Sequence, residues 1–284
     1  MSTFVTPRAV DTAIAPPKAS RRRRPGGSWW AWLVFIIGAT YFIVPLVATL
    51  EFSLRPNPPT FAYENVLTDR RFYASLIYSF VIGLITIVLS LALIVPTAYW
   101  VRLRLPRLRP IVEFVTLLPF VLPPIVLAYG MIRFYSRQPL VLTGTELGSD
   151  FLLVAAYVVL SLPYMYRAVD NGLAAMDVRV LTEAAQSMGA GWFRILWSVI
   201  FPNLRTAALS GAFLTLAIVV GEFTIASALA RDAFGPYLSL LGKDKIYEPA
   251  AVALISFGLT WLAMISLALV ARGSRTRVQM GMPR

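Results

Sequence analysis

The sequence predicts an all-α membrane protein with six transmembrane helices and both termini in the cytoplasm. Three observations support this fold class: 58% of the 284 residues are hydrophobic, apolar runs of about 20 residues recur, and basic residues gather in alternate connecting segments. A run of that length is sufficient for a helix to cross the hydrocarbon core of a bilayer. The chain has no Cys and no His, which excludes a thiol nucleophile, an imidazole base and a soft metal site.

Six apolar runs are expected to span the membrane. The first is longer than the apolar core of a secretory signal and lacks a prompt small-x-small cleavage site, so it is expected to stay attached. The fourth run is the shortest. In chain order the runs are Trp29–Leu50, Leu76–Trp100, Ile111–Tyr135, Phe151–Tyr166, Ala207–Leu229 and Pro249–Ala271.

The charge distribution sets the expected orientation. With the N-terminus placed inside, the inner segments hold most of the 26 Lys and Arg residues, as the positive-inside rule describes. We expect residues 1–28 to be a disordered basic cytoplasmic tail, residues 29–271 a transmembrane domain, and residues 272–284 a cytoplasmic C-terminal tail. The Arg21–Arg24 run fits a topology determinant better than lipid recognition. A nucleic-acid partner is not expected, because no aromatic-interleaved basic face accompanies that run.

Three prolines interrupt the third run. Pro119, Pro123 and Pro124 each remove a backbone hydrogen bond, and in lipid the freed carbonyls need new partners. A broken helix of this kind is tolerated where it packs inside a bundle or lines a cavity. The segment Pro119–Gly130 is therefore expected either to line a pathway or to be a structural kink only.

The segment between the fourth and fifth runs, about residues 168–204, is the longest inner loop. Asp177 is placed to cap a helix over Val178–Met188, because its carboxylate can accept hydrogen bonds from free first-turn amides. An amphipathic stretch over Trp192–Ile200 is then expected to lie along the inner membrane surface and to stop at Pro202. The apolar stripe that would face a groove of a partner protein consists of Leu181, Ala184 and Met188.

Two acidic residues lie inside apolar runs, where such residues are functional candidates. Glu113 is close to the basic inner loop, so pairing with Arg107 or Arg109 is expected rather than a role in transport. Glu222 lies in the outer half of the fifth run, where no Lys or Arg of the same helix is within two turns. It is expected to act either in a pathway or gate, or in a structural hydrogen bond between helices.

The chain has no phosphate-binding loop. Its only Gly-Lys pair, Gly242-Lys243, is followed by Asp244 and lacks the required upstream Gly. If the protein is powered by ATP, another chain must bind it, and we expect neither a cofactor in this chain nor an enzymatic activity of its own.

The inner loop carries a spaced motif. Glu183-Ala184-Ala185 is followed by Gly189 and then by Phe201-Pro202. This frame resembles the EAA loop of type I ABC importer permeases, with Val199 and Phe201 where that family has Ile and Leu. The resemblance implies the permease fold, a multi-pass location in the bacterial cytoplasmic (inner) membrane, and an ATPase-coupling loop that includes Glu183, Ala184, Ala185, Met188, Gly189 and Pro202.

The resemblance covers about residues 73–271, with a departure at Tyr78-Ser79, where relatives usually have Asn-Ser. Within the fifth run, the order Glu222–Ser227 looks most like the spermidine/putrescine permeases. It implies a permease subunit of an ATP-driven, binding-protein-dependent importer, with a polyamine as cargo. Ferric iron, an oxyanion or another small organic solute is the alternative within the family. The residues expected at the pathway or gate are Glu222, Phe223, Tyr129, Pro123 and Pro124.

The resemblance also implies partners. These are two copies of an ATP-binding subunit, a second permease chain (a related chain or a copy of this one) and a periplasmic or lipid-anchored substrate-binding protein. Two rivals from another class are a membrane-embedded enzyme and a passive channel. An enzyme would need a second catalytic group near Glu222 or Glu113, and neither His nor Cys is present to supply it. A channel would carry the inner loop only as a linker.

Overall fold

The computed structural model describes residues 29–279, apart from the side chains of residues 263, 264, 267, 268 and 270–279. The predicted tail of residues 1–28 and the end of the predicted C-terminal tail lie outside the described residues. Every regular element of the described part is helical, as predicted. The elements are α1 (Trp29–Ser53), α2 (Phe61–Thr68), α3 (Arg70–Leu103), η1 (Pro106–Leu108), α4 (Arg109–Val121), α5 (Pro124–Tyr135), α6 (Glu146–Ala174), α7 (Val178–Ser187), α8 (Trp192–Ile195), η2 (Leu196–Ile200), α9 (Phe201–Gly221), α10 (Thr224–Ala228), α11 (Phe234–Asp244) and α12 (Glu248–Gln279).

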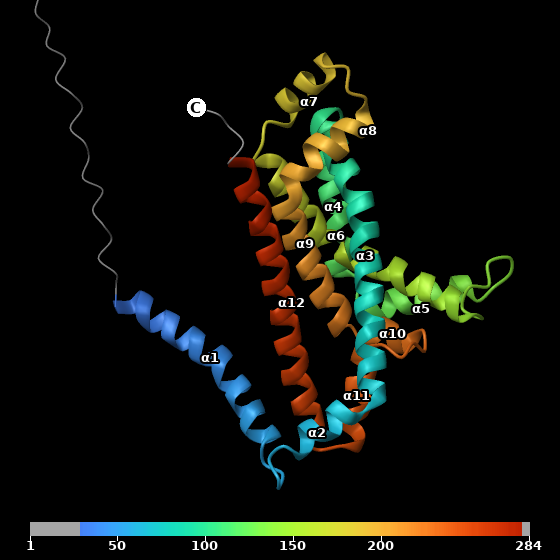
Figure 1. Cartoon of the computed structure of the whole chain (residues 1–284). Helices are drawn as coiled ribbons and strands as arrows, with labels where there is room; N and C mark the ends of the chain where they lie inside the picture. Colours follow the sequence, from blue (N-terminus) through green and yellow to red (C-terminus); the bar gives the residue numbers. More distant parts are fainter. Residues whose placement is uncertain (1–28, 280–284) are drawn as a thin grey trace, which may run out of the picture. The chain divides into compact units, whose positions relative to one another are not determined.

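The chain divides into two compact units, residues 1–48 and residues 49–284. In the second unit, α3, α6 and α9 pack pairwise on one another and form the centre of a bundle. Helices α7 and α8 lie at one end of this bundle, and α2 and α11 lie at the other (Figure 1). We call these the inner end and the outer end, following the orientation predicted from the charges.

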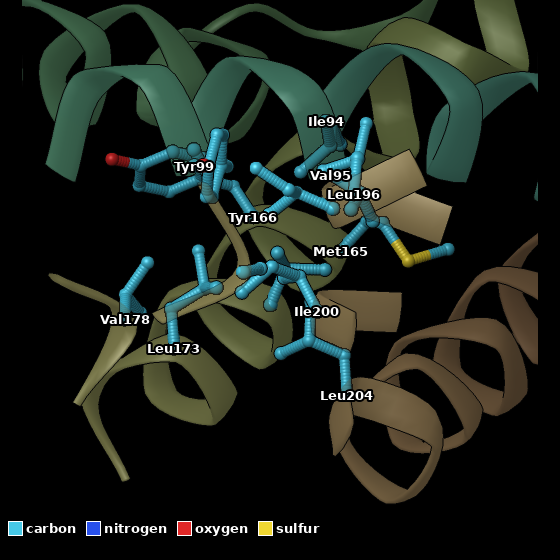
Figure 2. Packing of buried hydrophobic residues seen from close by; sticks show 14 residues of the cluster. Ile94, Val95, Tyr99, Met165, Tyr166, Leu173, Val178, Leu196, Ile200 and Leu204 are labelled. Atoms are coloured by element: carbon cyan, nitrogen blue, oxygen red, sulfur yellow. The ribbon is translucent and has the colours of Figure 1, made fainter. Parts of the chain in front are cut away.

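The inner end contains a continuous apolar cluster. Tyr99 of α3, Leu173 of α6 and Ile200 of η2 are buried in it together (Figure 2). Val178, the first residue of α7, is buried in the same cluster. The cluster beneath α7 is formed by residues of α3, α6 and η2. Helix α7 is therefore packed against the ends of the long helices and not merely tethered by its loops.

Two glycines let α6 and α9 approach closely. A Cβ added to Gly172 would lie 2.6 Å from the Cβ of Ala207, and one added to Gly211 would lie 2.7 Å from the sulfur of Met165. Both separations are too short for real carbon contacts, so the helix crossing requires glycine at these positions. Ala207 and Gly211 of the fifth run thus serve packing within this chain.

Four helical stretches are long and apolar enough to cross a membrane: α1, α3, α6 and the stretch Trp192–Gly221. Helices α4 and α5 make a fifth span if the bent pair is taken as one. In α12 the apolar part within the described side chains, Glu248–Leu262, is shorter than a span. The structure therefore supports four or five spans, and the count of six stays a prediction.

The third predicted run, Ile111–Tyr135, is not one continuous helix. The chain breaks between α4 and α5, whose axes differ by 97°. Pro123 and Pro124 supply no amide hydrogens, and a proline forces the residue before it out of the helical conformation. Leu122 is accordingly extended, with φ −86° and ψ 116°. Pro119 lies inside α4 and does not end it.

The fifth run differs from the prediction at both ends. The stop predicted at Pro202 is wrong, because α8, η2 and α9 form one helical stretch. Pro202 is the second residue of α9, directly after the π-helical turn η2, so its missing amide hydrogen falls where the regular α-helical hydrogen-bond pattern is already interrupted. The helix predicted to continue to Leu229 instead ends at Gly221, and the chain is extended at Glu222 (φ −76°, ψ 129°).

Two other helices are longer than their apolar runs. The second predicted span, Leu76–Trp100, begins in the structure at Arg70, because Asp69 caps α3 by accepting a hydrogen bond from the amide of Arg71 at 2.8 Å. The fourth, Phe151–Tyr166, corresponds to α6, which extends through Ala174. Polar turns at helix ends carry no apolar signal, and a count of apolar residues therefore misses them.

Candidate functional site

Helix α7 begins at a side-chain cap and ends at a glycine turn. Asp177 caps it as predicted, because its Oδ1 accepts a hydrogen bond from the amide of Val180 at 3.1 Å. Beyond the helix, Gly189 has φ +78°, in the left-handed region that favours glycine. A Cβ on Gly189 would meet nothing within 4 Å. The turn therefore requires glycine for its backbone conformation and not for packing inside this chain.

Helix α7 has one buried face and one exposed face. Val178, Thr182 and Ala185 are buried toward the bundle. Leu181, which was expected in the partner-facing stripe, packs half-buried against the inner-end cluster. The predicted coupling residues that are exposed are Glu183, Ala184, Met188 and Gly189, whereas Pro202 is half-buried in α9. The structure thus keeps four of the predicted residues on one accessible surface and turns Ala185 inward.

Glu183 forms an ion pair on this exposed surface. The Nε atom of Arg179 donates a hydrogen bond to its Oε1 at 2.8 Å. This hydrogen bond raises the pKa of the Arg179 guanidinium, so the residue stays positively charged. Water screens a pair that is this exposed, and either member can exchange its partner for a charge on another protein.

The break between α9 and α10, residues 222–223, is organised by Glu222. We call this break the elbow. The Oε1 atom of Glu222 accepts a hydrogen bond from the amide of Ile225 at 2.8 Å, and Oε2 accepts one from the amide of Ala226 at 3.1 Å. Oε2 also accepts from the hydroxyl of Tyr157 at 3.0 Å. Glu222 therefore caps α10 and ties it to α6.

These three donors change how the charge of Glu222 is interpreted. A carboxylate has about four acceptor positions, and three hydrogen bonds occupy most of them. The two amides at the start of α10 also carry partial positive charge toward the carboxylate. The structural role left open by the sequence, a hydrogen bond between helices, is therefore present, and the pathway or gate role stays a prediction.

A groove of about 410 Å³ lies beside the elbow. It brings together Pro124 and Glu222, two of the residues predicted for the pathway, and no Lys or Arg is among its lining residues. Tyr129 and Phe223 are exposed and do not line it, and neither does Pro123. The lining residues, drawn from α4, α5, α6, α9 and the elbow, are Pro119, Phe120, Pro124, Leu160, Tyr164, Ala217, Ile218, Gly221 and Glu222.

An ionic cluster joins α3, α4 and α6 at the inner end. Glu113 pairs with Arg109 at 2.8 Å, as predicted. Arg109 also reaches Asp170 at 3.1 Å, and Arg102 lies 3.8 Å from the same carboxylate. The role of Asp170 was missed, because a pair separated by 61 positions in the chain leaves no local pattern.

A second ionic cluster lies at the outer end. Arg231 is 2.7 Å from Asp150 and donates a hydrogen bond to the hydroxyl of Tyr78 at 3.2 Å. That hydroxyl in turn donates to Asp150. Tyr78 stands where the resembled family usually has Asn, and here it completes a bridge between α3, α6 and the loop before α11. The cluster borders an outer cleft of about 670 Å³.

Comparison with known proteins agrees with this architecture. Residues 90–278 match the family described as "Binding-protein-dependent transport system inner membrane component". The "Molybdenum transport system permease protein ModB" of Mycobacterium tuberculosis is 29% identical, over 89% of this chain and 95% of that protein. ModB of Escherichia coli K12 is 26% identical, over 75% and 98%. The "Spermidine/putrescine transport system permease protein PotB" of Haemophilus influenzae is 24% identical, over 70% and 74%.

A solved structure has the same fold. "Crystal structure of an amino acid ABC transporter with histidines" superposes with a TM-score of 0.50 at 18% identity, over 71% of this chain and 93% of that chain. The family match runs from the middle of α3 into α12 and includes α7, the groove and the elbow. The chain is therefore a multi-pass inner-membrane protein that belongs to the family of inner-membrane components of binding-protein-dependent transport systems.

Proposed function

We propose that this chain is the permease subunit of an ATP-driven importer whose cargo is a small oxyanion, with molybdate as the first to test. The observation that carries the proposal is the similarity to proteins named as molybdenum permeases, which extends over 89% of this chain for the mycobacterial relative. The relative named for spermidine and putrescine covers a smaller share, at lower identity. The sequence favoured a polyamine and left ferric iron, an oxyanion or another small organic solute as alternatives, of which the oxyanion now becomes the main proposal.

The chemistry of Glu222 supports the same choice. A polyamine would need a carboxylate free to offset the cost of removing its ammonium groups from water. The carboxylate of Glu222 already accepts three hydrogen bonds from the protein, so little of its capacity is left for a cation.

The exposed face of α7 supports coupling to a separate ATP-binding subunit. Ala184 and Met188 are exposed apolar side chains beside the screened ion pair of Glu183. No atom of this chain lies within 4 Å of a Cβ added to Gly189, so a partner could approach its backbone closely. A groove on the partner could receive the apolar pair while exchanging charges with Glu183. In this proposal the partner supplies ATP hydrolysis and this chain supplies the path.

The groove lies on the surface of this chain, so a second permease chain is needed to close the path. A related chain or another copy would supply the other wall, and each would offer one α7 to one of two ATP-binding subunits. A periplasmic or lipid-anchored binding protein would deliver the cargo at the outer end. The Pro124 and Glu222 side of the groove is the wall that this chain contributes.

Uptake by the reconstituted complex tests the proposal. The chain would be purified with its ATP-binding subunit, second permease chain and binding protein, placed in liposomes, and given labelled molybdate or labelled spermidine. We expect ATP-dependent accumulation of molybdate that unlabelled tungstate, and not spermidine, competes away. Accumulation of spermidine instead would restore the polyamine as cargo. Flux without ATP would indicate a channel, and failure to co-purify an ATP-binding subunit would contradict the permease role.

A further inference from the structure

The first observation is a buried hydrogen bond between α7 and α3. The hydroxyls of Tyr99 and Thr182 are 3.1 Å apart, and both residues are almost fully buried. Thr182 donates its own proton to the carbonyl oxygen of Val178 at 2.6 Å. A hydroxyl has one proton to donate, so Tyr99 must be the donor to Thr182. The bond joins the helix with the exposed coupling surface to the longest helix of the bundle.

The second observation lies farther along α3. Ser90 and Ser161 are 2.8 Å apart between α3 and α6, and both are buried. Ser161 donates to the carbonyl oxygen of Val158 at 2.8 Å, so Ser90 must donate to Ser161. Ser90 and Tyr99 are nine positions apart on one continuous helix, which corresponds to about 14 Å at 1.5 Å per residue.

The third observation completes the series at the elbow. Tyr157 lies one turn from Ser161 on the same helix, is buried, and donates to Glu222. Three interhelical hydrogen bonds therefore follow one another from α7 to α3, from α3 to α6, and from α6 to the elbow. Each has an assigned direction. The first two join buried side chains, where little water can replace a lost partner, and the third joins the buried Tyr157 to the half-buried Glu222, which lines the groove.

From this geometry we propose that the three hydrogen bonds form a relay through which movement of α7 reaches the elbow. The relay rests on the proposed function, because it takes its input from an ATP-binding subunit docked on α7. One continuous helix connects each bond to the next: α3, which contains Pro96 between Ser90 and Tyr99, and then α6 between Ser161 and Tyr157. A shift of α7 is therefore followed along these helices, or one of the interhelical bonds breaks. The elbow can take up the movement, because the helical hydrogen bonds are interrupted between α9 and α10.

The test uses isosteric variants of each bond. Tyr99→Phe, Ser90→Ala and Tyr157→Phe each remove a donor hydroxyl with little change of shape. Thr215→Val is the matched control, because Thr215 is fully buried on α9 and its hydroxyl is the one buried side-chain polar atom without a hydrogen bond among the described residues. Uptake per ATP hydrolysed would be measured for the full complex in liposomes, with capture of the ATP-binding subunit measured in parallel.

We expect each relay variant to capture the ATP-binding subunit normally and to lose about threefold in uptake per ATP, the ratio that corresponds to a typical interhelical hydrogen bond in a membrane. The variant with both Tyr99→Phe and Tyr157→Phe should again lose about threefold rather than about ninefold, because links in series are not additive. Thr215→Val should take up as much cargo per ATP hydrolysed as the unmodified protein.

Three outcomes would overturn the relay. If the single variants take up as much cargo per ATP hydrolysed as the unmodified protein, the bonds carry no movement. A ninefold loss in the double variant would show independent effects on stability. If the unmodified complex captures no ATP-binding subunit, the proposed function itself fails, and the relay fails with it for lack of an input. Normal capture with unchanged coupling would contradict the relay alone.

Discussion

The inner end and the elbow use the same local device with different consequences. At each, an acidic side chain caps a short helix: Asp177 lies directly before α7, and Glu222 lies two residues before the start of α10. Asp177 is exposed and serves only its own helix, whereas Glu222 is half-buried and also accepts a hydrogen bond from Tyr157 of another helix. The comparison implies that losing the first cap frays one helix, while losing the second separates two parts of the bundle.

Glu222→Ala should have the largest effect. It leaves the amides of Ile225 and Ala226 and the hydroxyl of Tyr157 without their acceptor. Buried donors without partners cost about 1–3 kcal/mol each, so we expect a loss of about 3 kcal/mol or more in the free energy of unfolding. Thermal or denaturant unfolding in detergent would measure it. An unchanged midpoint would mean that the elbow is not held by Glu222.

Glu222→Gln separates capping from charge. The amide keeps one acceptor oxygen and the shape of the side chain, so we expect a smaller loss of stability than for Glu222→Ala. If Glu222 also lies at the pathway or gate, uptake should fall while membrane insertion, ATPase docking and binding-protein affinity stay intact. Unchanged uptake kinetics would reduce Glu222 to a packing residue.

Gly172→Val should have the next largest effect, at the inner end. A side chain there would collide with Ala207 and Leu204 of α9, and overpacking of this kind costs about 1–3 kcal/mol. Gly130→Val is the matched control, because Gly130 also lies within a helix and a Cβ there meets nothing within 4 Å. Equal unfolding midpoints for the two variants would contradict the close crossing of α6 and α9.

Asp177→Ala should have a local effect. Loss of a helix cap costs about 1 kcal/mol. The substitution removes the side-chain hydrogen bond that the amide of Val180 donates to Asp177 and keeps the backbone bond from the amide of Leu181 to the carbonyl of residue 177. Hydrogen exchange should quicken for the amides of α7 and stay unchanged in α3 and α6. If exchange quickens throughout the bundle, the cap at Asp177 is as widely coupled as Glu222, and the contrast between the inner end and the elbow is lost.

Ala230→Gly should have the smallest effect. Ala230 has φ 53° just after α10, a left-handed conformation that is unfavourable for residues with a Cβ. Glycine relieves this strain but gains entropy in the unfolded chain, so we expect a net stabilisation below about 1 kcal/mol. Ala228→Gly, inside α10, should destabilise slightly instead. A clear loss of stability for Ala230→Gly would show that its methyl group makes a needed contact.

The sequence predicted interactions between near neighbours and missed those between distant residues. The cap from Asp177 to Val180 and the pair of Arg109 with Glu113 are three and four positions apart, a spacing that helical geometry makes recognisable. The partner of Glu222 is Tyr157, 65 positions away. Only packing of α6 beside the elbow brings them together, so no pattern in the fifth run could indicate it.

Breaks in helices were predicted only in part. Pro123 and Pro124 indicated a disrupted third run, but the 97° bend depends on where α5 packs, which the prolines do not determine. The EAA-type motif predicts a coupling loop, yet it did not separate the exposed Ala184 from the buried Ala185. Which face of a short helix is buried depends on the cluster beneath it, here formed by residues of α3, α6 and η2.

The most direct test of the central claim, that α7 docks an ATP-binding subunit, is site-specific cross-linking. The chain has no Cys, so one introduced cysteine is the only reactive thiol. Met188→Cys places it beside α7 at a position 81% exposed, and Leu147→Cys places it at the opposite end of α6 at a position 83% exposed. With a photoreactive maleimide, we predict an adduct with the ATP-binding subunit from Met188→Cys and none from Leu147→Cys. No adduct from Met188→Cys, or equal adducts from both, would contradict the account.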